Sequence, residues 1–227
     1  LLESRGYKVC FIAQPDWKST DDFKRFGEPR LAFLVSSGNI DSMVNHYTVA
    51  KKKRAVDLYS PGGKAGMRPD RADIVYCNKI REVYKHANII IGGIEASLRR
   101  LSHYDYWDNR VRRSILLDSG ADLLLYGMGE RQIIEVAEAL ESGIPASEIT
   151  FVRGTVYKTK DKDRAYDYIR LPDFNEVKES KEKYCESFML QYENTDSVVG
   201  KSLMEKYDEY YVVQNPPEKP LTTQELD

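Results

Sequence analysis

The sequence predicts an α/β protein with a doubly wound, mostly parallel sheet. Short apolar runs rich in Val, Ile and Leu, too brief for helices, are typical of buried parallel strands. They lie at Lys8–Ala13, Leu31–Val35, Asn88–Ile91 and Asp122–Tyr126. Helical spacing of apolar residues follows at Asp70–Lys85 and Arg131–Glu141. Strands that alternate with helices in this way are typical of Rossmann-like and flavodoxin-like sheets.

The two predicted helices carry start and stop signals. Asp70 is placed to cap the first helix, with Asp73 at the capping-box position, and Tyr76 and Ile80 share one face. Gly143 is placed to end the second helix. Both segments therefore have the length and boundaries of helices that pack on a sheet.

The first residues predict the last turn of a helix with Gly6 as its cap, followed by the strand at Lys8–Ala13. The chain does not begin with Met, and a βαβ unit needs a strand before its helix. We therefore expect a further strand, with its own loop, ahead of Leu1.

The pattern changes beyond about residue 148. Residues 150–172 predict two strands joined as a hairpin by the polar turn Lys158–Arg164, and Phe174–Tyr192 has the spacing of an amphipathic helix. Residues 202–220 predict a second strand pair that runs into a proline-rich linker. We expect a Rossmann-like domain over residues 1–148 and a small α+β appendage over 149–227.

Composition excludes several classes of protein. With 34 basic and 36 acidic residues, the net charge of −2 indicates neither a nucleic-acid coat nor a membrane surface. Cys10, Cys77 and Cys185 lie far apart and are typical of thiols in a reducing compartment. The sequence has no apolar run of about 20 residues, and no charged segment followed by an apolar core suggests a signal peptide. We expect a cytoplasmic protein without a membrane partner.

Polar residues follow the predicted strands, where a doubly wound sheet binds its ligands. The segments are "VSSGNIDSMVNHY" (35–47), "GGIEASLRR" (92–100), "LSHYDYWDNRVRR" (101–113) and "LYGMGERQ" (125–132). Each of the first three segments also has a purely structural interpretation. In 35–47 this is a turn and an ordinary N-cap, with His46 packed in the helix. In 92–100 it is ion pairing among the charged residues themselves, and in 101–113 it is a surface helix with a Trp anchor. The candidate ligand-binding residues are Asn39, Asp41, Glu95, Arg99, Arg100, His103, Asp105 and Glu130.

Known nucleotide signatures are missing. The segment after the last strand lacks the third glycine of GxGxxG, and the chain has no GxxxxGK[ST]. A basic, glycine-rich segment at residues 59–71, with the preceding Lys51–Arg54, has the chemistry to hold phosphate through amides and cations. The alternative is a solvated loop.

Several motifs together carry a family resemblance over nearly the whole chain. They are "QPDW", "GNIDSMVNHYT", "YSPGGKAGMRPDR", "IVYCNKIRE", "GGIEASLRR", "ADLLLYGMGE" and "VVQNPP". The chain closely resembles the amino-terminal region of YgiQ-type radical SAM proteins, a region similar to Rossmann-like cobalamin-binding domains. The resemblance implies that a radical SAM barrel follows, with a CxxxCxxC motif for a [4Fe–4S] cluster that works with S-adenosylmethionine. The sequence lacks the DxHxxG of base-off cobalamin domains, so we expect no cobalamin.

Two hypotheses for function follow. The first is an accessory domain that selects or shields a substrate for the radical SAM domain of the same protein, and that is inactive alone. The second is a non-enzymatic module that binds RNA or a protein partner through Lys51–Arg54, Lys64, Arg68 and Arg71, with tyrosines to stack on bases. The residues after Asp227 would discriminate, because a CxxxCxxC there defines the enzyme class.

Overall fold

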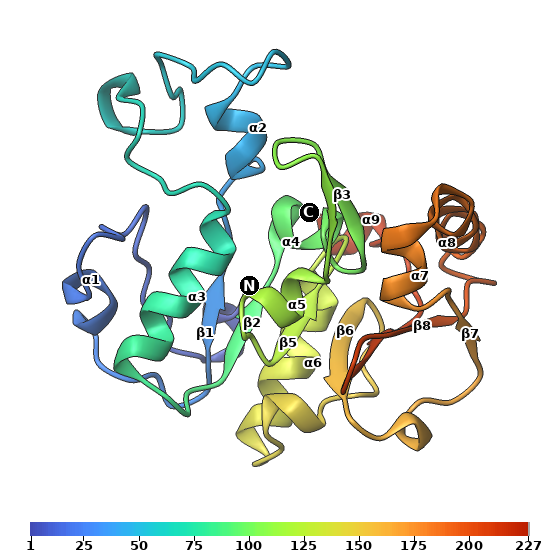
Figure 1. The fold of residues 1–227 in the computed structure, drawn as a ribbon. Coiled ribbons are helices and arrows are strands. Elements are labelled where there is room, and N and C mark those ends of the chain that lie inside the picture. The colour runs from blue at the N-terminus through green and yellow to red at the C-terminus, as the bar shows by residue number, and fades with distance from the viewer. Residues whose placement is uncertain (227) are drawn as a thin grey trace.

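A single seven-stranded sheet with helices on both faces forms the centre of the molecule (Figure 1). The computed structural model describes residues 1–226. The strand order is β1-β2-β5-β6-β9-β8-β7, and β3 and β4 pair separately as a two-stranded sheet. The strands are β1 (Phe33–Val35), β2 (Ile89–Ile91), β3 (His103–Asp105), β4 (Arg110–Arg112), β5 (Leu123–Leu125), β6 (Thr155–Thr159), β7 (Tyr168–Arg170), β8 (Ser202–Lys206) and β9 (Tyr211–Gln214).

Helices connect and cover these strands. The α-helices are α1 (Asp21–Lys24), α2 (Ser42–His46), α3 (Ala72–Val83), α4 (Gly93–Leu98), α5 (Ile115–Asp118), α6 (Glu130–Glu141), α7 (Phe174–Glu179), α8 (Lys181–Glu193) and α9 (Thr223–Leu226). Short 3₁₀ turns lie at η1 (Glu3–Arg5), η2 (Pro61–Gly63), η3 (Ala146–Glu148) and η4 (Lys162–Arg164). None of the helices within the described part of the chain is long and apolar enough to cross a bilayer.

Strand pairing confirms the predicted Rossmann-like α/β class. β1, β2 and β5 are parallel neighbours, as the apolar runs predict. β6 then pairs antiparallel with β5, β9 with β6 and β8 with β9, while β7 pairs parallel with β8. The strands beyond residue 148 thus extend the same sheet, and the boundary between residues 1–148 and 149–227 stays a prediction.

Alternate residues of the strands feed two hydrophobic cores, one on each face of the sheet. On β2, Ile89 and Ile91 pack on one face with α3, α4 and α5, and Ile90 packs on the other with α6. All three isoleucines are almost fully buried. Strands buried on both faces explain why these segments are uninterrupted apolar runs.

The predicted strand at Lys8–Ala13 is wrong. Residues 8–12 have no regular structure, and the side chains of Val9 and Phe11 are 45% and 83% exposed. A strand needs a hydrogen-bonded neighbour as well as an apolar sequence, and this segment pairs with none of the described strands.

The predicted hairpin over residues 150–172 is also wrong, although both of its strands exist. β9 and β8 lie between β6 and β7 in the sheet. Three strand spacings of about 4.8 Å therefore separate the two, and the connection of residues 160–167 is long enough to bridge them. The predicted β8–β9 pair is confirmed, and its hairpin occupies the place between β6 and β7.

Two helix details also differ from the prediction. Ser180 ends α7 and caps α8, because its hydroxyl accepts a hydrogen bond from the Lys183 amide, so the segment 174–192 is two helices. Asp70 does not cap α3: Arg71, with a φ of 53°, occupies the N-cap position. Asp70 instead accepts hydrogen bonds from side chains of the α2 region.

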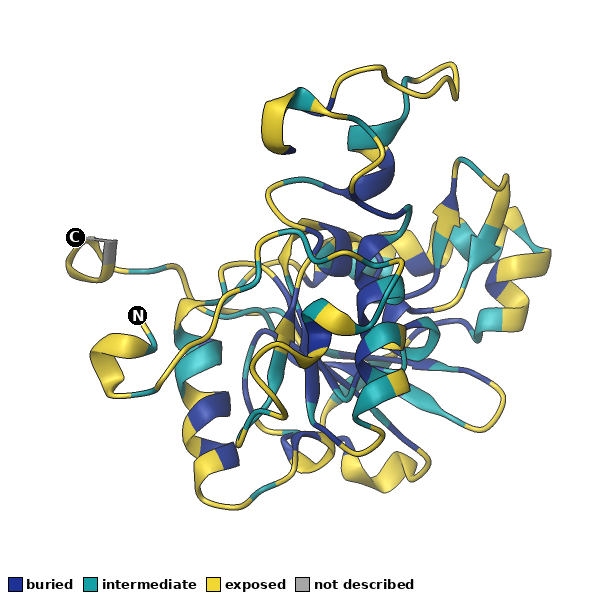
Figure 2. Ribbon diagram, turned by 90° about the vertical axis from the view of Figure 1, so that its left-hand side faces the viewer, coloured by how far each residue is buried: buried dark blue, intermediate teal, exposed yellow. Residues whose placement is uncertain are grey.

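A long excursion of the chain follows α2. Residues 47–70 rise away from the sheet and return to the start of α3 (Figure 1), and most of this segment is exposed or half-buried (Figure 2). Two isolated bridges, Tyr47 with Lys53 and Val56 with Lys64, hold it together. Helix α2 and this excursion, here called the 47–70 loop, form the walls of the pockets described below.

Candidate functional site

Segments that follow β1 and β2 enclose a small pocket of about 180 Å³, here called the strand-end pocket. Parallel neighbouring strands bring their following loops to the same edge of a sheet, which is why these segments meet. Four of the eight predicted site residues line it: Asp41, Arg99, His103 and Asp105. Val44, Leu98, Tyr104 and Trp107 complete the lining.

Asp41 and Arg99 form a buried ion pair at one wall of this pocket. Asp41 also caps α2, because its Oδ1 accepts hydrogen bonds from the amides of Met43 (2.9 Å) and Val44 (3.1 Å). Burial lowers the pKa of Arg99 to about 10, so the guanidinium still carries its charge at neutral pH. The pair therefore contributes no net charge, and it joins the end of α4 to the start of α2.

His103 presents an unused hydrogen-bond acceptor. Its Nδ1 lies 3.1 Å from the carbonyl oxygen of Leu101, which can only accept, so Nδ1 carries the proton and Nε2 has the lone pair. Burial lowers the pKa of His103 to about 4, and the ring is neutral at pH 7. Neither His103 Nε2 nor the indole N–H of Trp107 has a hydrogen-bond partner among residues 1–226. Two residues that line the pocket thus each carry a buried polar atom without a hydrogen-bond partner, one an acceptor and one a donor.

Asp105 fixes the loop that carries Trp107. Its carboxylate accepts hydrogen bonds from Arg71 at 2.7 and 3.1 Å and from the amides of Trp107 and Asp108, and Arg112 lies 2.9 Å away. Burial alone would raise the pKa of Asp105, but hydrogen bonds and the nearby arginines lower it overall. Asp105 is therefore ionised, charge-matched and in position to orient the indole.

Glu95 lies outside this pocket, and its surroundings favour a structural role. The side chain is fully buried, and its carboxylate accepts the backbone amides of Ser42 (2.8 Å) and Asp73 (3.3 Å). These amides belong to the first turns of α2 and α3. The carboxylate therefore satisfies helix-end donors that would otherwise be buried without partners.

The remaining three predicted residues lie elsewhere. Asn39 and Glu130 are exposed. Arg100 donates a 2.6 Å hydrogen bond to Gln214 and its guanidinium lies over the ring of Tyr126, 5.0 Å from the centroid. The structure thus separates these residues from Asp41, Arg99, His103 and Asp105.

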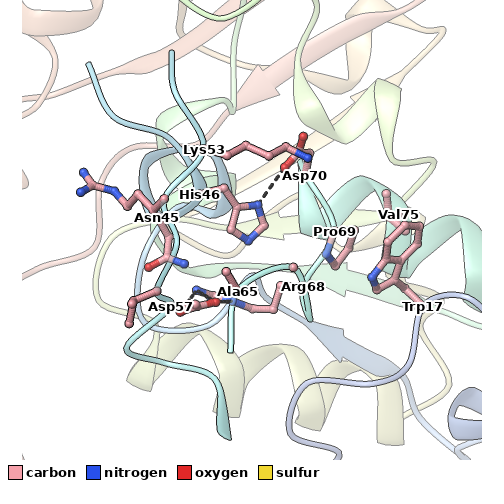
Figure 3. Close-up of a pocket in the computed structure, with 13 residues that line it drawn as sticks. Trp17, Asn45, His46, Lys53, Asp57, Ala65, Arg68, Pro69, Asp70 and Val75 are labelled. Carbon is pink, nitrogen blue, oxygen red and sulfur yellow. Dashed lines mark hydrogen bonds and ion pairs between the residues drawn. The ribbon is translucent and has the colours of Figure 1, made fainter. Parts of the chain in front are cut away.

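A larger pocket of about 480 Å³ lies on the other side of α2, under the 47–70 loop, and is here called the loop pocket. Val44 of α2 lines the strand-end pocket, whereas Asn45 and His46 line the loop pocket (Figure 3). Its remaining lining residues are Trp17, Lys53, Arg54, Val56, Asp57, Ala65, Gly66, Arg68, Pro69, Asp70 and Val75.

Sequence reasoning missed Trp17 and Trp107 as individual site residues. Trp107 lies in the segment 101–113 that was recognised as rich in pocket-forming residue types. Trp17 lies in "QPDW", and no local signal there indicates that it reaches a loop more than thirty residues further along the chain.

The described residues do not fit an iron–sulfur cluster. A [4Fe–4S] cluster needs three or four converging thiolates. Cys10 and Cys185 are exposed and Cys77 is buried, and residues 1–226 contain no group of three His, Cys, Asp or Glu that could hold a metal.

The fold and its pockets define a Rossmann-like α/β domain with two cavities at one edge of the sheet. The chain belongs to the Radical SAM N-terminal family, which matches residues 1–227. This match confirms the resemblance inferred from the motifs.

Relatives extend well beyond the matched region. A UPF0313 protein of Clostridium botulinum (strain ATCC 19397 / Type A) is 59% identical over 227 residues, which are 100% of this chain and 35% of that protein. One from Clostridium perfringens (strain ATCC 13124) is 59% identical over 228 residues, with 34% of that protein covered. The chain thus spans about a third of the length of these relatives. No solved structure matches it.

Proposed function

We propose that this chain is the substrate-recognition domain of a radical SAM enzyme and that the strand-end pocket binds part of the substrate. The observation that carries the proposal is the pair of unsatisfied groups in one pocket, His103 Nε2 and Trp107 Nε1. Buried polar atoms without partners cost free energy, so such atoms in a cavity indicate a missing partner.

The chemistry of the lining limits the ligand. Asp41 is matched by Arg99, and Asp105 by Arg71 and Arg112, so the pocket offers little net charge. A free acceptor and a free donor together suit a hydroxyl or amide group, which can donate to His103 and accept from Trp107. Val44 and Leu98 supply apolar walls. We infer a neutral polar group on an otherwise apolar part of the substrate.

Family membership supports a [4Fe–4S] cluster and S-adenosylmethionine in the full-length protein. We propose that residues outside this chain hold both, since the described cysteines do not converge. The cluster and cofactor supply a radical by reductive cleavage of S-adenosylmethionine. The role of the present chain is to bind and orient the substrate and to exclude water around the reacting atoms.

The experiment compares His103→Gln with His86→Gln in the full-length protein. His86 is exposed and lies outside both pockets, which makes it a matched control. We measure S-adenosylmethionine cleavage with and without the small-molecule fraction of a cell extract. We expect both variants to keep the basal rate of cleavage. The increase in rate that the extract causes should be at least about tenfold smaller in His103→Gln than in His86→Gln.

Two results would contradict this proposal. Full stimulation in His103→Gln would mean that the pocket does not recognise the substrate. A parallel loss of basal cleavage and folded protein would mean that His103 is a structural residue.

A second candidate is a module that binds RNA through the basic segment. Lys51–Arg54 are exposed, and none of the four forms an ion pair with another described side chain. Binding of a fluorescent single-stranded RNA oligonucleotide should then weaken by about 300-fold or more between 50 and 200 mM salt if six or more phosphates are contacted. The absence of binding at 50 mM salt would exclude this candidate.

A further inference from the structure

We propose that the loop pocket binds the terminal phosphate of a small molecule. This inference is independent of the strand-end pocket, because the two cavities share no lining residue. At about 480 Å³, the loop pocket has the size of a small-molecule site. Figure 3 shows the His46 ring between the side chains of the 47–70 loop, with Trp17 on the far side of Pro69 in this view.

One carboxylate in the lining is already neutralised. Arg68 donates to both oxygens of Asp57 at 3.2–3.3 Å, and both side chains are almost fully buried. Burial would raise the pKa of Asp57, but hydrogen bonds from Tyr59 and Ser60 and the charge of Arg68 lower it overall. This pair is a fixed, neutral part of the pocket floor.

The second carboxylate is occupied by two side chains. His46 Nδ1 lies 2.8 Å from one oxygen of Asp70, and the Tyr47 hydroxyl donates to the other at 2.6 Å. Burial would raise the pKa of Asp70, but these hydrogen bonds lower it overall. An ionised carboxylate only accepts, so Nδ1 of His46 carries a proton and Nε2 is left for a ligand.

The groups that remain suit an anion that can also donate a proton. Lys53 and Arg54 form no ion pair with the described side chains, so cations outnumber carboxylates in the lining. The indole N–H of Trp17 and Nε2 of His46 are buried and have no partner within residues 1–226. Trp17 can donate to a ligand oxygen, and the lone pair of His46 Nε2 can accept a hydrogen bond from the P–O–H of a protonated phosphate.

The chemistry of these unpaired groups favours a terminal phosphate over other anions. Trp17 Nε1, Asn45 Nδ2 and His46 Nε2 are all buried without a partner, so a group that reaches them has to enter the cavity, which a chain-internal phosphodiester does less readily. A terminal phosphate monoanion combines a P–O–H, which can donate to His46 Nε2, with further oxygens that can accept from Trp17 and attract the lining cations. A carboxylate has two oxygens and one charge.

The experiment is calorimetric titration of the full-length protein with inorganic phosphate, pyrophosphate and malonate at 50 mM salt. We expect phosphate and pyrophosphate to bind more tightly than malonate. Trp17→Phe keeps the ring and removes the N–H, and Lys53→Gln removes one charge. Each should weaken pyrophosphate binding by about fivefold or more.

Lys52→Gln is the matched control, because Lys52 is exposed on the same segment but does not line the pocket. It should change affinity by less than about twofold. Equal losses in Lys52→Gln and Lys53→Gln would overturn the proposal in favour of a diffuse basic surface. Tighter binding of malonate, no binding of either phosphate, or binding of an RNA oligonucleotide alone would overturn it as well.

Discussion

Glu95 Oε2 accepts a 2.8 Å hydrogen bond from the backbone amide of Ser42, and its other oxygen accepts the amide of Asp73 at 3.3 Å. One fully buried carboxylate on α4 thereby holds the first turns of α2 and α3. Helix α2 carries residues of both pockets and α3 carries Val75 of the loop pocket, so the contact positions the whole site.

We predict that Glu95→Ala destabilises the chain by about 3 kcal/mol, because two buried backbone donors lose their acceptor. Glu95→Gln, which keeps one acceptor oxygen, should cost about half as much. Chemical denaturation measures both. Glu138→Ala, at an exposed position of α6, is the control and should cost less than about 0.5 kcal/mol. If Glu95→Ala were as stable as the wild type, the carboxylate would not be needed for folding, and a ligand-binding role for Glu95 would be favoured instead.

The buried carboxyl group of Asp73 should make the folding stability of the chain depend on pH. Its side chain is fully buried, both carboxylate oxygens lack partners among the described residues, and burial, with the charge of Glu95, raises its pKa well above 3.8. The folded chain therefore keeps a proton that the unfolded chain loses above pH 3.8, so this group lowers stability as the pH rises.

Asp73→Asn should remove that cost. We expect its melting temperature to exceed that of the wild type by about 2–4 °C at pH 7.5, with the difference shrinking toward pH 4. Thermal melts across this range are the measurement. A destabilisation that is the same at every pH would show that the carboxyl makes a required hydrogen bond.

The contribution of His103 to folding stability changes with pH in the opposite direction. Burial lowers its pKa from 6.5 to about 4, so the unfolded chain takes up a proton first as the pH falls. The stability contributed by the neutral ring is present above pH 6.5 and is lost as the pH falls toward 4. His103→Gln should flatten the fall in melting temperature between these values, whereas His86→Gln should keep the wild-type slope. An unchanged slope in His103→Gln would mean that the imidazole is protonated in the fold.

Cys10 and Cys185 should not be cluster ligands. Both are exposed, and neither belongs to a metal-holding group in the described structure. After anaerobic reconstitution, the full-length Cys10→Ser, Cys185→Ser double variant should contain about four irons per chain, as the wild type should. Loss of iron from the double variant would place the catalytic centre within this chain.

The sequence was sufficient for the parts of the fold that depend on local patterns. β2 and β5 are buried on both faces, whereas β1 is an edge strand with Leu34 50% exposed, and all three are continuous apolar runs that can be recognised without a structure. Helix α6 has a one-sided apolar pattern and lies where it was predicted. The motifs were sufficient for the family.

Tertiary contacts decided what local patterns leave open. The segment Lys8–Ala13 is apolar enough for a strand but has no neighbouring strand, and β6 and β7 are separated because β8 and β9 pair between them. Strand pairing is a long-range choice, and the residues of a strand do not specify its partner.

For the candidate site, too, some features follow from the local sequence and others only from tertiary contacts. By itself, the sequence determined that polar residues follow β1 and β2, which placed Asp41, Arg99 and His103 at one edge of the sheet. Only the tertiary structure decided that Glu95 turns inward to two helix ends and that Trp17 closes a pocket with His46. The physical reason is that burial, charge pairing and unsatisfied hydrogen bonds are properties of three-dimensional neighbours, and these neighbours lie far apart along the chain.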